Sequence, residues 1–534
     1  MSAPAVVVAG PPPIKKQVVP EIFNQQPVVY DPNENPNWVT AIFLGFQHYL
    51  TMVGTSVLIP LLIIRAIGGE AGDLARTVQS VLFVSAINTL VQTYFGTRLP
   101  VVMGNSFYFL PIVLSIVNRG IIDIPDPHER FLRGMRATQG AFIAGSFLNI
   151  IFGFSGLWAA IMKCISPIVI APITILVGLG LFEEAFLGVS KCVEFGKPAL
   201  FLMFLFATYL RHHEIRKPHP YIFELYPVIL AVVIVWSYAA ILTAAGAYDH
   251  ASELTQMNCR TDRSGLVSAA PWVRIPYPFQ WGRPTFDAGD VFSVMAAAFA
   301  TLIESTGGFY TVSRLAGAVP PPPKVISRSI GWQGIGLLFN GFWGTFTGTT
   351  VAPENVGLVG LNRVGSRRTV QIAAVFMLFF SIFGKFGAVV ASIPQPIVAA
   401  ILFVTFGMVG TTGISMLQFA NMNLKRNVFV VGFSLFMGLT VPQYFREFAT
   451  RAGHGLVHTN ARWFNDISNA FLSAPLILAF IVAAVLDINV TRDVSKADRG
   501  MLWKSNEDYS SDPRNFQFYR LPSMSLKTCF PRAT

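Results

Sequence analysis

The sequence predicts an all-α polytopic membrane protein. Three observations support this prediction: the composition, the long apolar runs, and two interrupted apolar runs at equivalent positions in the two halves of the chain. Of its 534 residues, 53% are hydrophobic and 13% are charged, and the mean hydropathy is +0.53. A soluble domain carries about 25% charged residues, so this chain has too little charge to cover a surface that faces water. At about 20 residues per membrane helix, its apolar residues are enough for roughly fourteen spans.

Other classes of protein are excluded by the same composition. Four cysteines in 534 residues are too few for a disulfide scaffold. The net charge of +11 (39 basic minus 28 acidic residues) comes from short basic clusters between apolar runs. Such clusters are typical of cytoplasmic loops, whereas a nucleic-acid partner would need them gathered on one face. We therefore expect a lipid bilayer around the chain and no nucleic-acid partner.

Fourteen apolar segments follow a tail at 1–37. The third and the tenth segments contain several Pro and Gly residues, and an interrupted backbone at membrane depth is tolerated only inside protein or along a cavity. We expect these two segments to be short and broken. The fourteen predicted spans are 38–64, 74–96, 99–118, 137–158, 164–182, 198–211, 221–246, 289–316, 327–346, 348–362, 368–392, 394–418, 425–442 and 471–490.

An internal repeat relates the two interrupted segments. Phe95-Gly96-Thr97 stands before the third segment and Trp343-Gly344-Thr345 before the tenth, 248 residues later, and the first and eighth spans begin 251 residues apart. Chance recurrence of such a tripeptide is the alternative. Because seven spans is an odd number, the second copy would enter the membrane from the opposite side. Paired broken segments in inverted halves point to the midplane site of a transporter.

The loops indicate an orientation. Basic residues gather in the connections that lie on the side of the N-terminus, among them Arg211, Arg216 and Lys217. The external connections depart from this pattern at Arg130, Arg133 and Arg136 and in the longer segments 247–288 and 443–470. Long loops cross the membrane largely regardless of charge. We expect both termini to be cytoplasmic and 247–288 to be an extracellular loop. Cys192 and Cys259 then both lie outside, where a disulfide is open to them, although we expect free thiols.

Two acidic residues lie at membrane depth. Glu304 is in the middle of the eighth span and Glu354 follows Pro353 in the tenth. A charged acid there costs on the order of 3 kcal/mol, so each needs a partner, a proton or a ligand. For Glu304 the alternative is an acid satisfied by a neighbouring hydroxyl or amide. For Glu354 it is helix capping, since an acid is favoured in a first helical turn.

The two breaks are expected to aim free backbone N–H groups at one midplane cavity. Such amides hold carbonyl oxygens, and carboxylates accept N–H donors, which suits a planar neutral ring that carries both. Phe107, at the first break, is a candidate for stacking on such a ring. His48 is the one histidine inside a predicted span, and a hydrogen-bond strut between helices is its favoured interpretation.

At these residues the chain resembles the nucleobase–ascorbate transporter family (nucleobase:cation symporter 2, among the xanthine/uracil permeases), most of all its plant branch. The resemblance runs from about Trp38 to Asn489 and includes Gln47-His48, Gly104-Asn105-Ser106-Phe107 and Glu304. Its most specific part is the stretch from Glu354 to Arg363, which is similar to the family signature.

The resemblance implies two inverted seven-span repeats that form a core domain and a gate domain. The core halves are 38–158 and 289–392, the gate halves are 159–246 and 393–490, and 491–534 is a cytoplasmic tail. Substrate would bind between the domains and be carried with protons by alternating access, without a metal or an organic cofactor. The implied substrate-binding residues are Glu304, Glu354, Ser106, Phe107, Pro353 and Asn355; Glu304 couples the proton, and Gln47, His48, Gln333 and Gly357 give structural support. Homodimers through gate-domain helices and a plasma-membrane location are also implied.

Three departures from the family pattern bear on these roles. Asn362 replaces a threonine of the signature, Gln333 stands where many purine carriers have aspartate, and Ser305 stands where histidine is common. Glutamate at the first signature position resembles carriers of uracil and other nucleobases. An ascorbate anion beside two carboxylates would cost energy.

Other functions stay as alternatives. They are a sodium-coupled or ascorbate carrier on the same fold, an anion exchanger of the sulfate-transporter type and a channel. A membrane enzyme is not expected, because the sequence has no evident nucleophile–base pair, metal-ligand cluster or phosphate-binding loop. Which nucleobase is carried stays open.

Overall fold

The computed structural model describes residues 28–118, 124–210, 222–262, 266–391, 393–452, 454–490, 494–495, 498–501 and 518–519. Most of the predicted N-terminal and C-terminal tails lies outside these ranges. So do the loop residues Arg211, Arg216 and Lys217, on which part of the predicted orientation rests.

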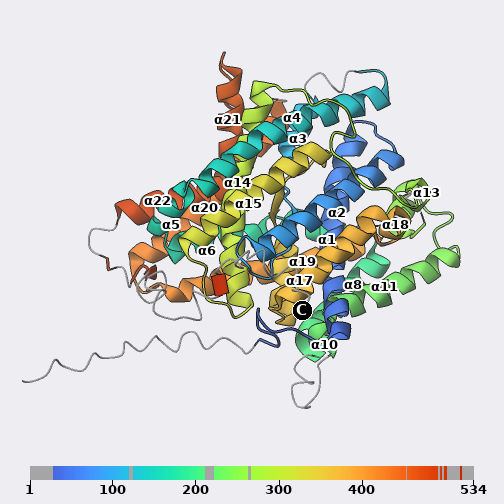
Figure 1. The fold of residues 1–534 in the computed structure, drawn as a ribbon, viewed down its shortest axis with the longest axis horizontal. Helices are drawn as coiled ribbons and strands as arrows, with labels where there is room; N and C mark the ends of the chain where they lie inside the picture. The colour runs from blue at the N-terminus through green and yellow to red at the C-terminus, as the bar shows by residue number, and fades with distance from the viewer. Residues whose placement is uncertain are drawn as a thin grey trace, which may run out of the picture.

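The described chain is helical apart from two short strands and the connecting loops (Figure 1). Its first half contains α1 (Trp38–Ala66), α2 (Ala71–Tyr94), β1 (Met103–Asn105), α3 (Phe109–Asn118), α4 (Pro127–Phe154), α5 (Leu157–Cys164), α6 (Pro167–Leu179), α7 (Phe182–Ser190), α8 (Val193–Phe204) with a π-helical continuation (Leu205–Leu210), α10 (Ile222–Leu225) and α11 (Pro227–Ala244).

The second half begins with the loop helices α12 (Glu253–Cys259) and α13 (Leu266–Ala269). It continues with α14 (Ala288–Leu315), α15 (Pro323–Trp343), β2 (Thr349–Val351), α16 (Pro353–Asn362), α17 (Arg367–Ile382), α18 (Gly384–Ala391), α19 (Gln395–Met416) with a 3₁₀ turn (Leu417–Phe419), α20 (Lys425–Ala452), α21 (Arg462–Leu472) and α22 (Pro475–Asn489).

The predicted class, an all-α polytopic membrane protein, is confirmed. Within the described ranges, 8 helices are long and apolar enough to cross a membrane, and two bent pairs raise the number to 10. The third and tenth segments are broken as predicted, because each is a three-residue strand followed by a ten-residue helix. The total of fourteen spans stays a prediction.

Several predicted boundaries were wrong. The fourth span begins at Pro127 rather than 137, because the Asp126 carboxylate caps the helix by accepting from the His128 N–H at 3.1 Å. The helix from Lys425 runs on to Ala452 instead of ending at 442. The predicted span 368–392 bends by 115° between α17 and α18.

Two further helices differ from the predicted spans. The stretch before the fifth span forms a separate helix, α5, which meets α6 at 105°. Helix α21 was not predicted, and it packs against α14 and α22. Its charged and polar residues make its composition unlike that of a membrane span, although one of its faces is apolar.

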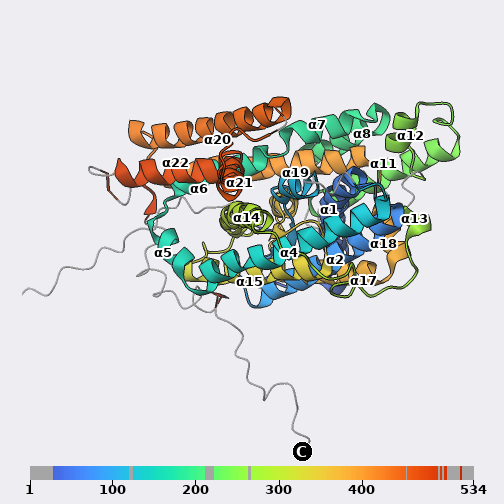
Figure 2. The same ribbon diagram turned by 90° about the horizontal axis from the view of Figure 1, so that it is seen from above.

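The helices form two layers (Figure 2). One layer holds α1, α2, α4, α15 and α17, which contact one another. The other holds α6, α7, α8, α19, α20 and α22, with α19 packed on α6, α7 and α8. Helices α14 and α16 contact both layers, since α14 packs on α4 and α6, and α16 packs on α1 and α19. Both candidate acids lie on these two central helices.

The two strands are buried and pair with each other. Their pairing is antiparallel, with Gly104 opposite Thr350. Helix α3 follows β1 in the sequence, and helix α16 follows β2. The turn before each strand contains a residue with positive φ, Arg98 (62°) and Phe346 (57°), at the same 248-residue offset as the repeated tripeptide. The predicted repeat is thus visible in the backbone.

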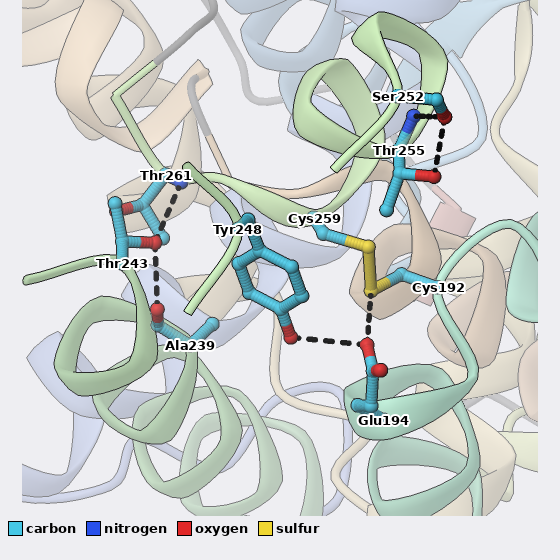
Figure 3. Close-up of a disulfide and its surroundings, with 9 residues drawn as sticks. All are labelled: Cys192, Glu194, Ala239, Thr243, Tyr248, Ser252, Thr255, Cys259 and Thr261. Atoms are coloured by element: carbon cyan, nitrogen blue, oxygen red, sulfur yellow. Dashed lines mark hydrogen bonds between the residues drawn. A yellow bond between two sulfur atoms is a disulfide. The ribbon is translucent and has the colours of Figure 1, made fainter. Parts of the chain in front are cut away.

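Cys192 and Cys259 form a disulfide, so the expectation of free thiols was wrong (Figure 3). The turn after α11 brings Tyr248 and α12 back over the start of α8, and the Tyr248 hydroxyl donates to Glu194 Oε2 at 3.0 Å. Burial and this hydrogen bond raise the pKa of Tyr248 to about 12, so the hydroxyl remains a donor. The loop that contains Tyr248 also contacts the layer that contains α15, because Gln280 Nε2 donates to Trp343 O at 3.0 Å.

The N-terminal segment lies at the opposite end of α8 and α11 from the disulfide. Helix α10, between these two helices, carries Glu224, whose carboxylate pairs with Arg363 at the end of α16. Next to Arg363, Tyr30 forms a parallel bridge with Val364. The disulfide and the N-terminal segment therefore mark opposite ends of the helices.

Candidate functional site

Glu304 joins the two broken segments. It lies in the middle of the 28-residue helix α14 and is 6% exposed. Its Oε2 accepts hydrogen bonds from Ser106 Oγ at 3.0 Å and from Thr350 Oγ1 at 2.9 Å. Ser106 follows β1, and Thr350 is in β2. One carboxylate therefore holds both breaks of the backbone through two hydroxyl donors.

Glu354 is the second residue of α16 and is 1% exposed. Pro353 occupies the first helical position, where its missing N–H is not needed. The Glu354 carboxylate accepts from Thr55 Oγ1 of α1 at 2.6 Å. The position in a first helical turn fits the capping interpretation, and the bond to Thr55 shows that the side chain also reaches another helix.

Asn355 and His48 contact each other as the strut interpretation predicts. Asn355 Nδ2 donates to His48 O at 2.8 Å and lies 3.2 Å from His48 Nδ1, and both side chains are buried. Gln47, the neighbour of His48, faces another element. Its Nε2 donates to Leu225 O at 3.1 Å, and its Oε1 accepts from Ile229 N at 3.2 Å. Helix α1 thus links α16 to the start of α11.

Two departures from the family pattern take part in the packing around β2. Gln333 Nε2 donates to Thr301 O at 3.3 Å and to Thr349 O at 3.1 Å, which ties α15 to α14 and to the strand. Ser305 Oγ accepts from Val351 N at 3.1 Å. Both side chains therefore support the strand that carries Thr350.

Gly357 lies at a close approach of α16 and α19. A Cβ at this position would meet the carbonyl oxygen of Thr405 at 2.1 Å, which is far inside van der Waals contact. The position fits the predicted supporting role, because a larger residue would push the two helices apart.

A narrow cavity lies beside Glu304, between the two layers. Glu304 and Pro353 are the predicted site residues among its lining, and they come from the central helices α14 and α16. Phe107 is half-buried and packs against the small apolar cluster of Leu181, Leu402 and Phe406. The other lining residues are Thr174, Val177, Gly307, Gly308, Thr311, Val351, Val356 and Val409.

Thr55 and Thr350 hydrogen-bond the two acids, and neither was predicted from the sequence. Thr55 lies seven residues after His48 and three after Met52, so helical periodicity places all three on one face of α1. That spacing was a usable signal for Thr55. Thr350 carries no such signal, because its contact with Glu304 depends on the strand register.

Cys192, Glu194 and Cys259 lie close enough together to resemble a metal-binding group. The disulfide leaves neither sulfur as a thiolate, and the thiolate is the form that binds metal. This cluster is therefore a structural link.

Comparison with known proteins gives consistent matches. Residues 39–447 match the model of a permease family, that of the xanthine/uracil permeases. Nucleobase-ascorbate transporter 2 of Arabidopsis thaliana is 50% identical over 515 residues, which cover 96% of this chain and 98% of the relative. Nucleobase-ascorbate transporter 7 of the same plant is 50% identical over 500 residues, covering 93% of this chain and 92% of the relative.

Solved structures are more distantly similar. The anion transporter SLC26A9 aligns with a TM-score of 0.43 at 13% identity, covering 85% of this chain and 65% of that protein. The transmembrane domain of the cyanobacterial bicarbonate transporter BicA aligns with a TM-score of 0.38 at 12% identity, covering 86% of this chain and 99% of that domain.

The matches in sequence extend over nearly the whole chain and over nearly the whole of each named relative. The family match over residues 39–447 includes the motifs at Gln47, Glu304 and Glu354. The chain belongs to the plant nucleobase–ascorbate transporter family, and it is an integral membrane transporter rather than an enzyme.

Proposed function

We propose that the protein is a proton-coupled symporter of neutral nucleobases. The observation that carries this proposal is the pair of buried acids beside the two broken segments, each held by hydroxyl donors: Ser106 and Thr350 for Glu304, and Thr55 for Glu354. A hydroxyl hydrogen bond does not neutralise a carboxylate as an arginine would. Such an acid gains from binding a proton or an N–H donor.

The two acids take different roles. Glu304 binds the transported proton, because its carboxylate contacts both broken segments and lines the cavity. Glu354 accepts an N–H of the base, and the backbone groups at Ser106, Phe107 and Pro353 complete the site.

Asn355 holds α16 against α1 through His48. Gln47, Gln333 and Gly357 support these elements through their contacts with neighbouring helices. The proton is the coupling ion, and the mechanism uses no metal or organic cofactor.

A neutral ring suits this site better than an anion. Ascorbate is an anion at neutral pH, and two carboxylates would repel it at a depth where screening is weak. The second candidate is still an ascorbate or sodium-coupled carrier, since the relatives are named for both nucleobase and ascorbate.

Alternating access would use the two layers as moving bodies. The layer of α1, α2, α4, α15 and α17, together with α14 and the broken segments, corresponds to the proposed core domain, 38–158 and 289–392. The layer around α19 corresponds to the proposed gate domain, 159–246 and 393–490. The cavity lies between them, where α14 and α16 face α6 and α19. Relative movement of the layers would open this interface to one side of the membrane at a time.

We also propose a plasma-membrane location with both termini cytoplasmic. The disulfide between Cys192 and Cys259 supports an extracellular position for 247–288, because disulfides persist in oxidising compartments. The N-terminal segment at Tyr30 is at the opposite end of the helices.

Homodimerisation through gate-domain helices is also part of the proposal. Helix α20 offers exposed aromatic side chains for it, among them Phe429 and Phe436. Cross-linking of cysteines introduced on α20 tests it.

Radiolabelled uptake in a transporter-deficient cell tests the function. We expect uptake of a nucleobase that rises at acidic external pH, does not depend on sodium, and is inhibited by other nucleobases but not by ascorbate. Uptake that needs sodium, or that ascorbate inhibits best, would contradict the proposal.

A further inference from the structure

The hydroxyl of Thr55 is a hydrogen-bond donor to the carboxylate of Glu354. The distance from Thr55 Oγ1 to Glu354 Oε1 is 2.6 Å, and the two residues lie 299 positions apart in the sequence. Thr55 is on α1 and Glu354 on α16, and both side chains are 1% exposed. A short bond from a hydroxyl to a carboxylate is among the stronger hydrogen bonds in proteins. It restricts the orientation of the carboxylate group.

Thr55 has a second acceptor within reach. Its Oγ1 lies 2.9 Å from the carbonyl oxygen of Met52, one turn earlier on α1. A threonine hydroxyl has one proton, so it donates to one of the two acceptors at a time. When Glu354 is engaged by another donor or is protonated, the Thr55 proton can turn to Met52 O. No buried donor is then left unsatisfied, and an unsatisfied buried donor would be unfavourable.

Other hydroxyls on the same helix behave differently. Thr51 Oγ1 donates to Gln47 O at 2.9 Å, and Ser56 Oγ donates to Met52 O at 3.1 Å. Both side chains are buried, at 1% and 0% exposure, and both of these bonds go to carbonyls of α1 itself. Thr55 differs from them in reaching the proposed substrate-binding acid. It joins α1 to the first turn of α16 through a side-chain carboxylate.

We propose that Thr55 is a positioning residue that sets the substrate specificity of this transporter, an inference that rests on the function proposed above. The Thr55 hydroxyl fixes the plane of the Glu354 carboxylate. The remaining lone pairs of Glu354 then meet a substrate N–H in one orientation. Bases that present an N–H in that direction bind well, and analogues in which that nitrogen is methylated bind poorly, because the methyl group removes the donor and adds bulk.

The test compares Thr55→Val, Thr55→Ser and Thr51→Val in a transporter-deficient cell, with surface expression measured for each. Thr55→Val keeps the shape of the side chain and removes the donor. We expect it to raise the KM for the nucleobase about tenfold while the maximal rate at equal surface expression stays within about twofold, a change of about 1.4 kcal/mol in binding. Thr55→Ser restores the donor and should restore the KM. Thr51→Val, the matched control on the same helix, should leave the KM unchanged.

The readout specific to positioning is discrimination between a base and its singly N-methylated analogues. The wild type should favour the unmethylated base at the nitrogen that Glu354 contacts, and Thr55→Val should reduce that ratio of inhibition constants several-fold. An unchanged KM and an unchanged ratio in Thr55→Val would overturn the role of Thr55. Equal losses in Thr55→Ser and Thr55→Val, or an equal effect of Thr51→Val, would also overturn it. A wild type that takes up no nucleobase would instead overturn the proposed function, so the two failures are distinguishable.

Discussion

The two broken segments have similar backbones and unequal chemistry. Each is a three-residue strand followed by a ten-residue helix, and the strands pair with each other. The first segment contributes the Ser106 hydroxyl and the Phe107 ring. The second contributes Thr350 and Glu354, and Glu304 comes from α14 in the same half of the chain. Both acids of the site thus belong to the second repeat.

The first repeat supplies one hydroxyl donor to each of those acids. Ser106 donates to Glu304, and Thr55 of α1 donates to Glu354. The main chain of His48 accepts from Asn355. The second repeat therefore carries both carboxylates together with the Thr350 hydroxyl, and the first repeat supplies the other hydroxyl donors. Removing a carboxylate should abolish transport, whereas removing a hydroxyl donor should only weaken it.

The largest effect is expected from Glu304→Gln. The amide keeps hydrogen-bonding capacity but binds no transported proton, so accumulation against a gradient should fall to background while the protein still reaches the membrane. Uptake driven by a pH gradient measures this. Glu129→Gln, at an exposed acid paired with Arg133, is the control and should behave as wild type. Undiminished accumulation by Glu304→Gln would refute its role.

Glu354→Pro should abolish nucleobase uptake nearly as completely. The substitution removes the carboxylate, whereas the first helical turn accommodates proline, so α16 should still form. Surface expression shows whether the variant still folds and reaches the membrane, and uptake of labelled nucleobase measures the loss of transport. Normal uptake would mean that this position does not contact substrate.

Two glycine substitutions compare the segments directly. In Gly357→Ala the new Cβ meets a backbone oxygen of α19 at 2.1 Å, whereas in Gly104→Ala it meets Ala352 Cβ at 2.9 Å. Overpacking costs roughly 1–3 kcal/mol, and rigid backbone yields less than a side chain. We expect transport to fall about tenfold or more for Gly357→Ala and less for Gly104→Ala, at equal surface expression. The reverse order would show that the strand pair is the tighter contact.

The two hydroxyls on Glu304 offer a finer comparison. Ser106→Ala and Thr350→Val each remove one of two hydrogen bonds to the same oxygen. Bonds to charged groups contribute roughly 1.5–3 kcal/mol, so each variant should lose uptake by about tenfold and the double variant by more. Initial uptake rates of the three variants test this. Loss in only one single variant would show that one segment holds Glu304 alone.

The smallest effect on uptake is expected outside both segments. Cys192→Ser removes a disulfide between residues 67 positions apart, and a loop of this size typically contributes roughly 2–4 kcal/mol to the free energy of unfolding. We expect a lower thermal midpoint for the detergent-solubilised protein, with uptake close to wild type at equal surface expression. An unchanged thermal midpoint would contradict the stabilising role.

The acids were predictable from sequence, whereas their partners were not. Glu304 stands out because a charge inside an apolar run is costly, and the breaks stand out because proline and glycine interrupt helices. Thr55 and Thr350 do not stand out, since hydroxyls are common in membrane helices and only the register between distant segments decides which of them meets an acid.

The same limit explains the corrected predictions. Nothing in the spacing of Cys192 and Cys259 shows that the turn after α11 folds back over α8. The bend after Ile382 lies in a run without proline, in which Gly384 and Lys385 interrupt the apolar residues, so the sequence predicted one span. The start of α4 was missed because its first turns are charged, which is typical of a loop as well as of a capped helix.

The proposed proton coupling is tested by the current that accompanies transport of a neutral base by the purified protein in supported membranes. If Glu304 carries a proton together with an uncharged substrate, adding nucleobase to the wild type should produce an inward positive current that grows at acidic pH, and Glu304→Gln should produce none. An equal current from Glu304→Gln, or nucleobase uptake by the wild type without any current, would contradict it.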